Sequence, residues 1–426
     1  MIYKNLDNNA LEAELKKEKK VYADLVSAGV SIDISRGKPC KEQLDLSMPM
    51  LNIINSVEDL PATGADIRNY GGLEGLPGVR KMFADILDVQ PENVIASDNS
   101  SLNLMYDTIQ RFMQFGVNGG IPWNKLEQVK WICPVPGYDR HFAITELFGV
   151  QMINVPMDEN GPIMSVVEDL VSNDASIKGM WCVPKYSNPA GITYSDEVVD
   201  RIANMKCLAD DFRVFWDNAY VVHDLYDTTD SLKNILTACA EAGNPNRPII
   251  FTSTSKVTLP GSGISCFATS EENIKDAIKS MKFQTIGPNK VNQYMHLLFL
   301  KNADGVKAQM KKHAEIIRPK FETILNALDE AFAESDIASW DKPNGGYFIS
   351  FNVLNGCAKR VGELCKGAGL VITNVGATYP YGKDDMDSNI RIAPTFTNTA
   401  ELDMACKILI ASTKLACIEH ILSERM

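Results

Sequence analysis

The middle of the chain alternates short apolar runs with longer segments that carry one apolar face. The apolar runs predict strands over residues 94–96, 129–133, 152–155, 179–183, 214–217, 249–252 and 264–269. The segments with helical spacing between them include 102–115, 139–148, 196–207 and 271–281. Short apolar strands separated by helices indicate a mostly parallel sheet that helices cover on both faces. The sequence therefore predicts an α/β fold for this part of the chain.

The two ends of the chain follow other patterns. Residues 8–28 have one apolar side with lysines opposite, which predicts an amphipathic helix. Asp7 or Asn8 should cap this helix and Gly29 should end it. After about residue 300, the pattern predicts a long charged helix, a strand, a helix, a strand and a last helix, over 304–333, 345–351, 357–368, 389–393 and 399–420.

These patterns predict two domains. We expect a large domain over residues 46–303, which contains the central sheet. A smaller α+β domain should combine residues 1–45, including an extended stretch before residue 40, with residues 304–426. Pro319 lies inside the long charged helix and should kink or break it, because proline removes a backbone donor and clashes with the preceding turn.

Composition narrows the classes of function. The 426 residues carry a formal net charge of −12 with a pI of about 5.0, which argues against a nucleic-acid or anionic-membrane surface. The ten cysteines include no CxxC pair and the five histidines form no ligand motif, so no metal site or disulfide framework is expected. No apolar stretch approaches the ~20 residues of a membrane span, and no apolar core of a signal peptide is present. We expect a cytoplasmic protein with no membrane partner.

Four polar residues follow predicted strands in one order: Asn188, Asp217, Tyr220 and Lys256. Each alone has an ordinary structural explanation, such as a surface lysine or a turn at Asn-Pro. Lys256 follows an apolar strand, and a fixed, partly desolvated amine suits Schiff-base chemistry. Asp217 ends a strand, where open α/β sheets place ligand groups. Together they are what a protein needs to hold pyridoxal 5'-phosphate (PLP): a Schiff-base lysine, an aspartate for the pyridine nitrogen, and a tyrosine and an asparagine for the phenolic oxygen.

This series resembles the class I/II (fold-type I) aminotransferase family, and collinear matches run from Arg36 to Arg391. The resemblance implies a large domain with a mostly parallel sheet, a smaller domain, and a PLP-dependent transaminase with a ping-pong mechanism. Its substrates would be an amino acid and a 2-oxo acid, and its active sites would be shared across a homodimer. The segments around Tyr138 and Lys256 look most like the bacterial type Ic aspartate aminotransferases, which favours aspartate and 2-oxoglutarate.

The resemblance also implies roles for residues outside the central series. Gly37 would line the substrate pocket with its backbone, Tyr138 would stack on the pyridine ring, and Arg391 would bind the substrate α-carboxylate. Asn188 would lie beside the substrate as well as the ring oxygen. Tyr70 would reach the cofactor phosphate of the partner subunit.

A phosphate site is expected at the start of the helix over 102–115. Asn99, Ser100 and Ser101 precede this helix, where backbone N–H groups, hydroxyls and the helix dipole suit an anion as well as a simple cap. Ser253 is a further candidate donor. These residues would hold the phosphate of PLP.

The sequence departs from the family at two places. Most class I members carry a phosphate-binding arginine eight residues after the lysine, where this chain has Ile264. Lys290 is the expected replacement for that charge. The stretch 283–286 also lacks the arginine that grips a side-chain carboxylate in well-known aspartate aminotransferases. The alternatives Arg36, Lys38 and Arg140 stay open at this point.

Two other functions remain to be separated from transamination. A PLP-dependent lyase or decarboxylase on the same fold would use the same cofactor residues. A PLP-binding transcriptional regulator would need a DNA-binding module, for which the sequence before residue 36 leaves no room. Stable accumulation of the aminated cofactor would distinguish a transaminase from a lyase.

Overall fold

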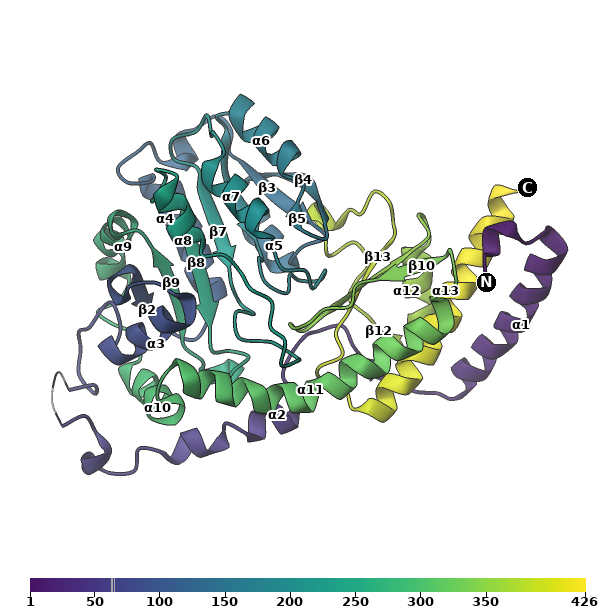
Figure 1. The fold of residues 1–426 in the computed structure, drawn as a ribbon, viewed down its shortest axis with the longest axis horizontal. Coiled ribbons are helices and arrows are strands. Elements are labelled where there is room, and N and C mark those ends of the chain that lie inside the picture. The colour runs from purple at the N-terminus through teal and green to yellow at the C-terminus, as the bar shows by residue number, and fades with distance from the viewer. Residues whose placement is uncertain (63, 65) are drawn as a thin grey trace.

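The computed structural model describes residues 1–62, 64 and 66–426. Within these residues the largest sheet has eight strands in the order β2-β9-β8-β7-β6-β3-β4-β5 (Figure 1). Its strands are β2 (Val94–Ala96), β3 (Lys130–Val135), β4 (Gln151–Asp158), β5 (Gly161–Pro162), β6 (Ile177–Cys182), β7 (Arg213–Asp217), β8 (Pro248–Ser253) and β9 (Ser265–Thr269). Neighbours are parallel except at β5 and at β9, which is antiparallel to β2 and β8. The predicted mostly parallel sheet is confirmed.

Helices cover both faces of this sheet. The helices of this part are α3 (Pro77–Leu87), α4 (Ser101–Phe115), α5 (Asp139–Leu147), α6 (Met164–Asn173), α7 (Asp196–Asn204), α8 (Ile235–Glu241), α9 (Glu271–Gln284) and α10 (Lys290–Leu300). One buried cluster joins the sheet to α3, α6, α7 and α8, and a second joins it to α4, α5 and α9. Successive residues of a strand point to opposite faces, so Val214 and Trp216 lie in the first cluster and Phe215 in the second.

The two ends of the chain meet in a second, smaller part. A three-stranded antiparallel sheet contains β10 (Ala338–Trp340), β11 (Ile349–Val353) and β13 (Asn389–Ile392) within the described residues. Two further strands, β1 (Ile32–Asp33) and β12 (Leu370–Val371), pair in parallel. The remaining helices of this part are α1 (Asn8–Ser27), α2 (Lys41–Asp45), α12 (Ala358–Gly367) and α13 (Thr399–Glu424). Figure 1 shows α1 beside α13 near both termini. The assignment of residues 1–45 to a smaller domain stays a prediction.

The break predicted at Pro319 does not occur. Helix α11 (Ala303–Phe332) continues through Pro319 as one element. Pro319 and Glu315, whose carbonyl loses its helical partner, both lie on the exposed side, where water can replace the missing hydrogen bond. The first turns of α11 join the large sheet's cluster through Val306 and Met310, and its later turns join the smaller part (Figure 1). A domain boundary at residue 304 stays a prediction.

The strand predicted over 345–351 begins later, at Ile349. Gly346 has a φ of +83°, which turns the chain before the strand starts. A Cβ on Gly345 would lie 2.1 Å from the ring of Tyr186, so any side chain larger than that of glycine would clash with this ring.

The structure shows no helix among its described residues that is long and apolar enough to cross a bilayer.

Candidate active site

A cavity of about 590 Å³ opens at the carboxyl end of β7, between the large sheet and the smaller part. This is the edge at which open α/β sheets place their ligands. The cavity collects most of the candidate residues of the sequence, namely Gly37, Ser100, Ser101, Tyr138, Asn188, Asp217, Tyr220, Lys256 and Arg391. Residues far apart along the chain therefore share one space.

Asp217 is the last residue of β7 and points a buried carboxylate at this cavity. His141 Nε2 lies 2.9 Å from Asp217 Oδ2, and the His141 ring stacks on Trp181 with centroids 4.3 Å apart. Among the described residues, Asp217 Oδ1 has no hydrogen-bond partner. A buried carboxylate oxygen without a donor is costly, so this atom is an acceptor that lacks its partner.

Lys256 lines the same cavity from the loop that follows β8. Its Nζ lies 5.1 Å from the ring centroid of Tyr220 and 5.8 Å from that of Tyr347. Burial lowers the pKa of Lys256, and the charge of Asp217 opposes that shift in part. The surroundings therefore favour a neutral amine, which is the form that acts as a nucleophile or base.

The two tyrosines of the cavity have shifted acidities. Burial raises the pKa of Tyr220, and the neighbouring Tyr138 and Asp217 raise it further. Burial also raises the pKa of Tyr138 to about 12. Both phenols therefore stay protonated near neutral pH and can donate hydrogen bonds into the cavity.

Arg391 reaches the cavity from β13 and is almost fully buried. Its Nη1 donates to Asp139 Oδ1 at 2.9 Å and to Asn188 Oδ1 at 3.2 Å. Its Nε donates to Thr373 Oγ1 at 3.3 Å, and the guanidinium carbon lies 4.9 Å from the ring centroid of Phe348. These contacts hold the planar guanidinium in one orientation at the cavity wall.

Of the residues predicted for the phosphate site, Ser100 and Ser101 line the cavity, whereas Asn99 and Ser253 do not. Ser100 precedes α4 without a side-chain cap hydrogen bond, so its hydroxyl is not used to close the helix. Ser255 also lines the cavity and donates to the Asn99 carbonyl at 3.0 Å. Ser253 lies behind it, with its Oγ 3.0 Å from Ser255 Oγ. Ser255 joins this site as a residue that the sequence did not single out.

Tyr70 and Lys290 do not line this cavity. The Tyr70 side chain is 82% exposed. Lys290 is buried, and its Nζ donates to the carbonyls of Asn69 at 2.8 Å and Gly71 at 2.6 Å. Within one chain, Lys290 thus holds the loop that presents Tyr70, and its role toward a phosphate stays a prediction. Ile264 stands where most class I members carry the phosphate-binding arginine. It is buried in the apolar cluster that joins the sheet to α3, α6, α7 and α8.

Sequence reasoning missed three side chains that shape the site. Asp139 and His141 follow Tyr138 at the start of α5. Residues three apart share a helix face, so the spacing of Tyr138 and His141 was a signal that both could face the site. Phe348 had no local signal. A Cβ on Gly37 would lie 2.5 Å from the Phe348 ring, so glycine is required where these two segments meet.

Comparison with known proteins decides the family. A sequence model described as aspartate amino-transferase matches residues 6–425. The chain belongs to the aspartate aminotransferase family. Aminotransferases of this fold-type I family use PLP, and this protein is an aminotransferase. The site fits that cofactor, because the unpartnered Asp217 Oδ1 can accept a hydrogen bond from a protonated pyridine nitrogen.

Members of the aspartate aminotransferase family match over almost the whole chain. The aspartate aminotransferase of Corynebacterium glutamicum is 47% identical over 403 residues, which is 94% of this chain and 93% of the relative. A Mycolicibacterium smegmatis protein named as an aminotransferase is 45% identical over 428 residues, 100% of each chain. The crystal structure of an aspartate transaminase from C. glutamicum superimposes with a TM-score of 0.96 at 45% identity and covers 99% of both chains.

Proposed function

We propose that this aminotransferase transfers the amino group of aspartate to 2-oxoglutarate by a ping-pong mechanism in the cavity beside β7. One observation carries the site: Lys256, the open oxygen of Asp217 and the guanidinium of Arg391 face one cavity. The names of two proteins from Corynebacterium glutamicum, similar over more than nine-tenths of the chain, support the choice of aspartate.

The proposed cofactor site uses residues along the length of the cavity. Asp217 Oδ1 would accept the pyridinium hydrogen bond, and His141 would orient that carboxylate from its other oxygen. Tyr220 and Asn188 would bind the ring oxygen, and Tyr138 would lie against the ring. The serine hydroxyls and the first N–H groups of α4 would bind the phosphate, with the helix dipole favouring its charge. Bound PLP supplies an electron sink that stabilises negative charge at the substrate Cα.

Lys256 has two proposed tasks. It would anchor the cofactor covalently before substrate arrives, which needs a neutral, nucleophilic amine. Once the substrate amine has displaced it, Lys256 Nζ would accept the proton from the substrate Cα and deliver it to the cofactor side. The lowered pKa of Lys256 supports both tasks, because each needs the neutral amine near pH 7.

Arg391 would bind the substrate α-carboxylate through Nη2, which has no acceptor among the described residues, and through Nη1, which would exchange one of its present acceptors for a carboxylate oxygen. Replacing Arg391 with lysine is expected to raise KM for L-aspartate by about 10- to 100-fold, with a smaller change in kcat, because lysine lacks the planar fork. Steady-state kinetics on both substrates would measure this. Arg360→Lys is the matched control, since Arg360 pairs with Glu419 on the outside of the smaller part. A fall in kcat alone would contradict a binding role.

The residue that would recognise the side-chain carboxylate of aspartate is one of three cations. Arg36, Lys38 and Arg140 all line the cavity and are exposed at its opening. Lys38 Nζ lies 3.9 Å from the ring centroid of Phe396, and this contact occupies one side of its ammonium group. The two arginines are therefore the stronger candidates, because a guanidinium binds a carboxylate bidentately.

A homodimer with shared active sites is the proposed assembly. Tyr70, Phe283 and Ile286 are exposed apolar side chains, with exposed fractions of 82%, 85% and 61%. We call these three residues the exposed patch, because the segment that follows α9 touches the Tyr70 loop: a Cβ on Gly287 would lie 2.4 Å from the carbonyl oxygen of Gly71. A second copy covering this patch would bring Tyr70 toward the partner's cavity.

Replacing Lys290 with methionine is expected to weaken PLP binding by about tenfold, because two charge-assisted hydrogen bonds to the Tyr70 loop are lost. Absorbance titration of the apoprotein with PLP at several salt concentrations would measure this. Lys81→Met, which alters an exposed lysine that pairs with Asp85 on α3, is the control. Unchanged PLP affinity and salt dependence in Lys290→Met would rule out any contribution of this lysine to phosphate binding.

The first test of the proposed function is the absorption spectrum of the PLP-loaded protein before and after L-aspartate is added. We expect the band of the lysine-bound cofactor to give way to that of its amine form, and 2-oxoglutarate to restore it. A response to another amino acid but not to aspartate would overturn the proposed substrate. Continuous turnover without the amine form would favour a lyase.

We also place the protein in the cytoplasm. All ten cysteines are free thiols in the structure, and all except Cys207 are buried. Buried free thiols suit a reducing compartment, where disulfides rarely form. Fractionation of cells that express the protein would test this location.

A further inference from the structure

Two buried arginines begin neighbouring strands at the edge of the sheet opposite the active site. Arg213 is the first residue of β7, and Arg247 directly precedes β8. The strands are parallel with Val214 beside Pro248, so the arginines occupy adjacent places in the register. Both line a separate cavity of about 590 Å³, bordered by the loops 117–120 and 243–246. Four residue steps of β7, about 13 Å, separate this edge from Asp217.

The guanidinium groups lack a carboxylate partner among the described residues. Arg213 is 4% exposed and gives one hydrogen bond, from Nη1 to the carbonyl of Phe212 at 3.0 Å. Its Nε is buried and has no partner in the described structure. Arg247 is 9% exposed, and its Nη1 donates to two carbonyls at the end of α7, those of Ile202 and Ala203. This arrangement lacks a counter-charge. Because a buried cation without an anion is costly, an anion bound here would stabilise it.

The acidic groups nearby are engaged elsewhere. Asp211 accepts from Lys178 at 2.7 Å and from an indole N–H at 2.8 Å. Glu272 accepts from Asn246 at 2.6 Å, and Asp276 accepts from Lys279 at 3.2 Å. Burial lowers the pKa of the Arg213 guanidinium to about 10; these three carboxylates oppose that shift, and Arg247 adds to it. None of them forms an ion pair with Arg213 in the described part of the chain.

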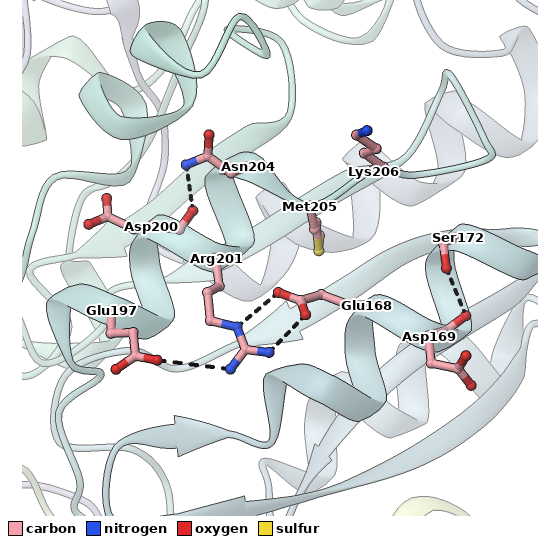
Figure 2. Close-up of a pocket in the computed structure, with 9 residues that line it drawn as sticks. All are labelled: Glu168, Asp169, Ser172, Glu197, Asp200, Arg201, Asn204, Met205 and Lys206. Atoms are coloured by element: carbon pink, nitrogen blue, oxygen red, sulfur yellow. Dashed lines mark hydrogen bonds and ion pairs between the residues drawn. The ribbon is translucent and has the colours of Figure 1, made fainter.

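A neighbouring pocket contains an arginine whose charge is balanced by carboxylates. Figure 2 shows Arg201 of α7 between the carboxylates of Glu168 and Glu197. Its Nε and Nη2 donate to the two oxygens of Glu168 at 2.9 and 2.8 Å, and Glu197 lies 4.0 Å from Nη1. That guanidinium is partly exposed and paired, whereas Arg213 is buried and unpaired.

We propose that the cavity at the amino ends of β7 and β8 binds a small anion through a phosphate group placed between Arg213 and Arg247. A phosphate has the charge and the number of acceptor oxygens that two guanidinium groups can satisfy. The cavity has room for more than inorganic phosphate, which suits the phosphate end of a small metabolite. This site does not depend on the proposed transaminase reaction.

The test uses the PLP-loaded protein, in which the cofactor's own phosphate occupies the proposed phosphate site at the start of α4. Inorganic phosphate is titrated at constant ionic strength set with sodium chloride, and binding is followed by calorimetry and by Tm. We expect saturable binding with a rise in Tm, and at least about tenfold weaker binding in Arg213→Met. Arg201→Met, which removes the same charge from the paired site of Figure 2, should bind phosphate as the unaltered protein does.

Two further variants make the result decisive. Asp210 is exposed and lines the same cavity, so Asp210→Asn should tighten phosphate binding about two- to threefold by removing a like charge. Without phosphate, Arg213→Met should have a Tm equal to or above that of the unaltered protein, because an unpaired buried charge is removed. If Arg213→Met does not fold, Arg213→Lys and Arg247→Met provide the comparison.

Glycerol 3-phosphate in parallel titrations distinguishes the source of the phosphate group. Tighter binding of the ester supports a metabolite, and tighter binding of inorganic phosphate supports the free ion. Either result supports the site if it is lost in the arginine variants. Absence of phosphate binding to the unaltered protein, or undiminished binding in both arginine variants, would overturn the proposal.

Discussion

Replacing Lys256 with alanine is expected to lower kcat for transamination by at least about 10⁴-fold, because the anchoring amine and the proton-transfer group are lost together. The same variant should bind PLP without forming the covalent link, so the absorption band of the lysine-bound cofactor should be absent. Single-turnover kinetics and the near-UV and visible spectrum would measure both effects. The expectation rests on the place of Lys256, which shares the cavity with Asp217 and lies against the ring of Tyr220.

A control variant and a rescue experiment test whether the loss of activity comes from the missing amine of Lys256 and not from the loss of a positive charge. Lys275→Ala removes a lysine whose Nζ pairs with Glu271 on the surface of α9, and activity should be unchanged. Added small amines should restore part of the activity of Lys256→Ala, since they can enter the cavity and move the proton. Residual activity above about 1% of the original without added amine would contradict the proton-transfer role.

Replacing Asp217 with asparagine is expected to lower kcat by about 10²- to 10³-fold, because the group that keeps the pyridine nitrogen protonated becomes neutral. The side chain keeps its shape, so the cofactor should still bind, with lower affinity. Kinetics at several pH values and a PLP titration would measure the change. His141 should lose its charged partner as well, since its Nε2 lies 2.9 Å from Asp217 Oδ2.

The control for this prediction is Asp200→Asn, which removes a carboxylate that pairs with Lys233 outside the cavity. That variant should keep full activity. If Asp217→Asn retained the kcat of the unaltered protein at all pH values, the open oxygen of Asp217 would have no part in the chemistry, and the proposed orientation of the cofactor would be wrong.

The sequence predicted the central sheet well because its signal is local. Short apolar runs between amphipathic segments mark strands that are buried on both faces, and the structure has β2, β3, β4, β6, β7, β8 and β9 at those places. The ends of helices were also local signals, as at Asp7, whose side chain accepts from Ala10 N at 2.8 Å. Of the kink or break expected at Pro319, the break does not occur, because this turn is exposed to water, and that exposure depends on what the helix packs against.

The sequence by itself determined which side chains follow which strands, and therefore that Asn188, Asp217, Tyr220 and Lys256 could meet at one edge of a sheet. Only the tertiary structure decided what completes the site. Arg391 reaches Asn188 across 203 residues, and the guanidinium pairs with Asp139 across 252 residues. The adjacent burial of Arg213 and Arg247 was equally hidden. Strand patterns are encoded by neighbouring residues, whereas these contacts depend on how distant segments pack, which no local pattern records.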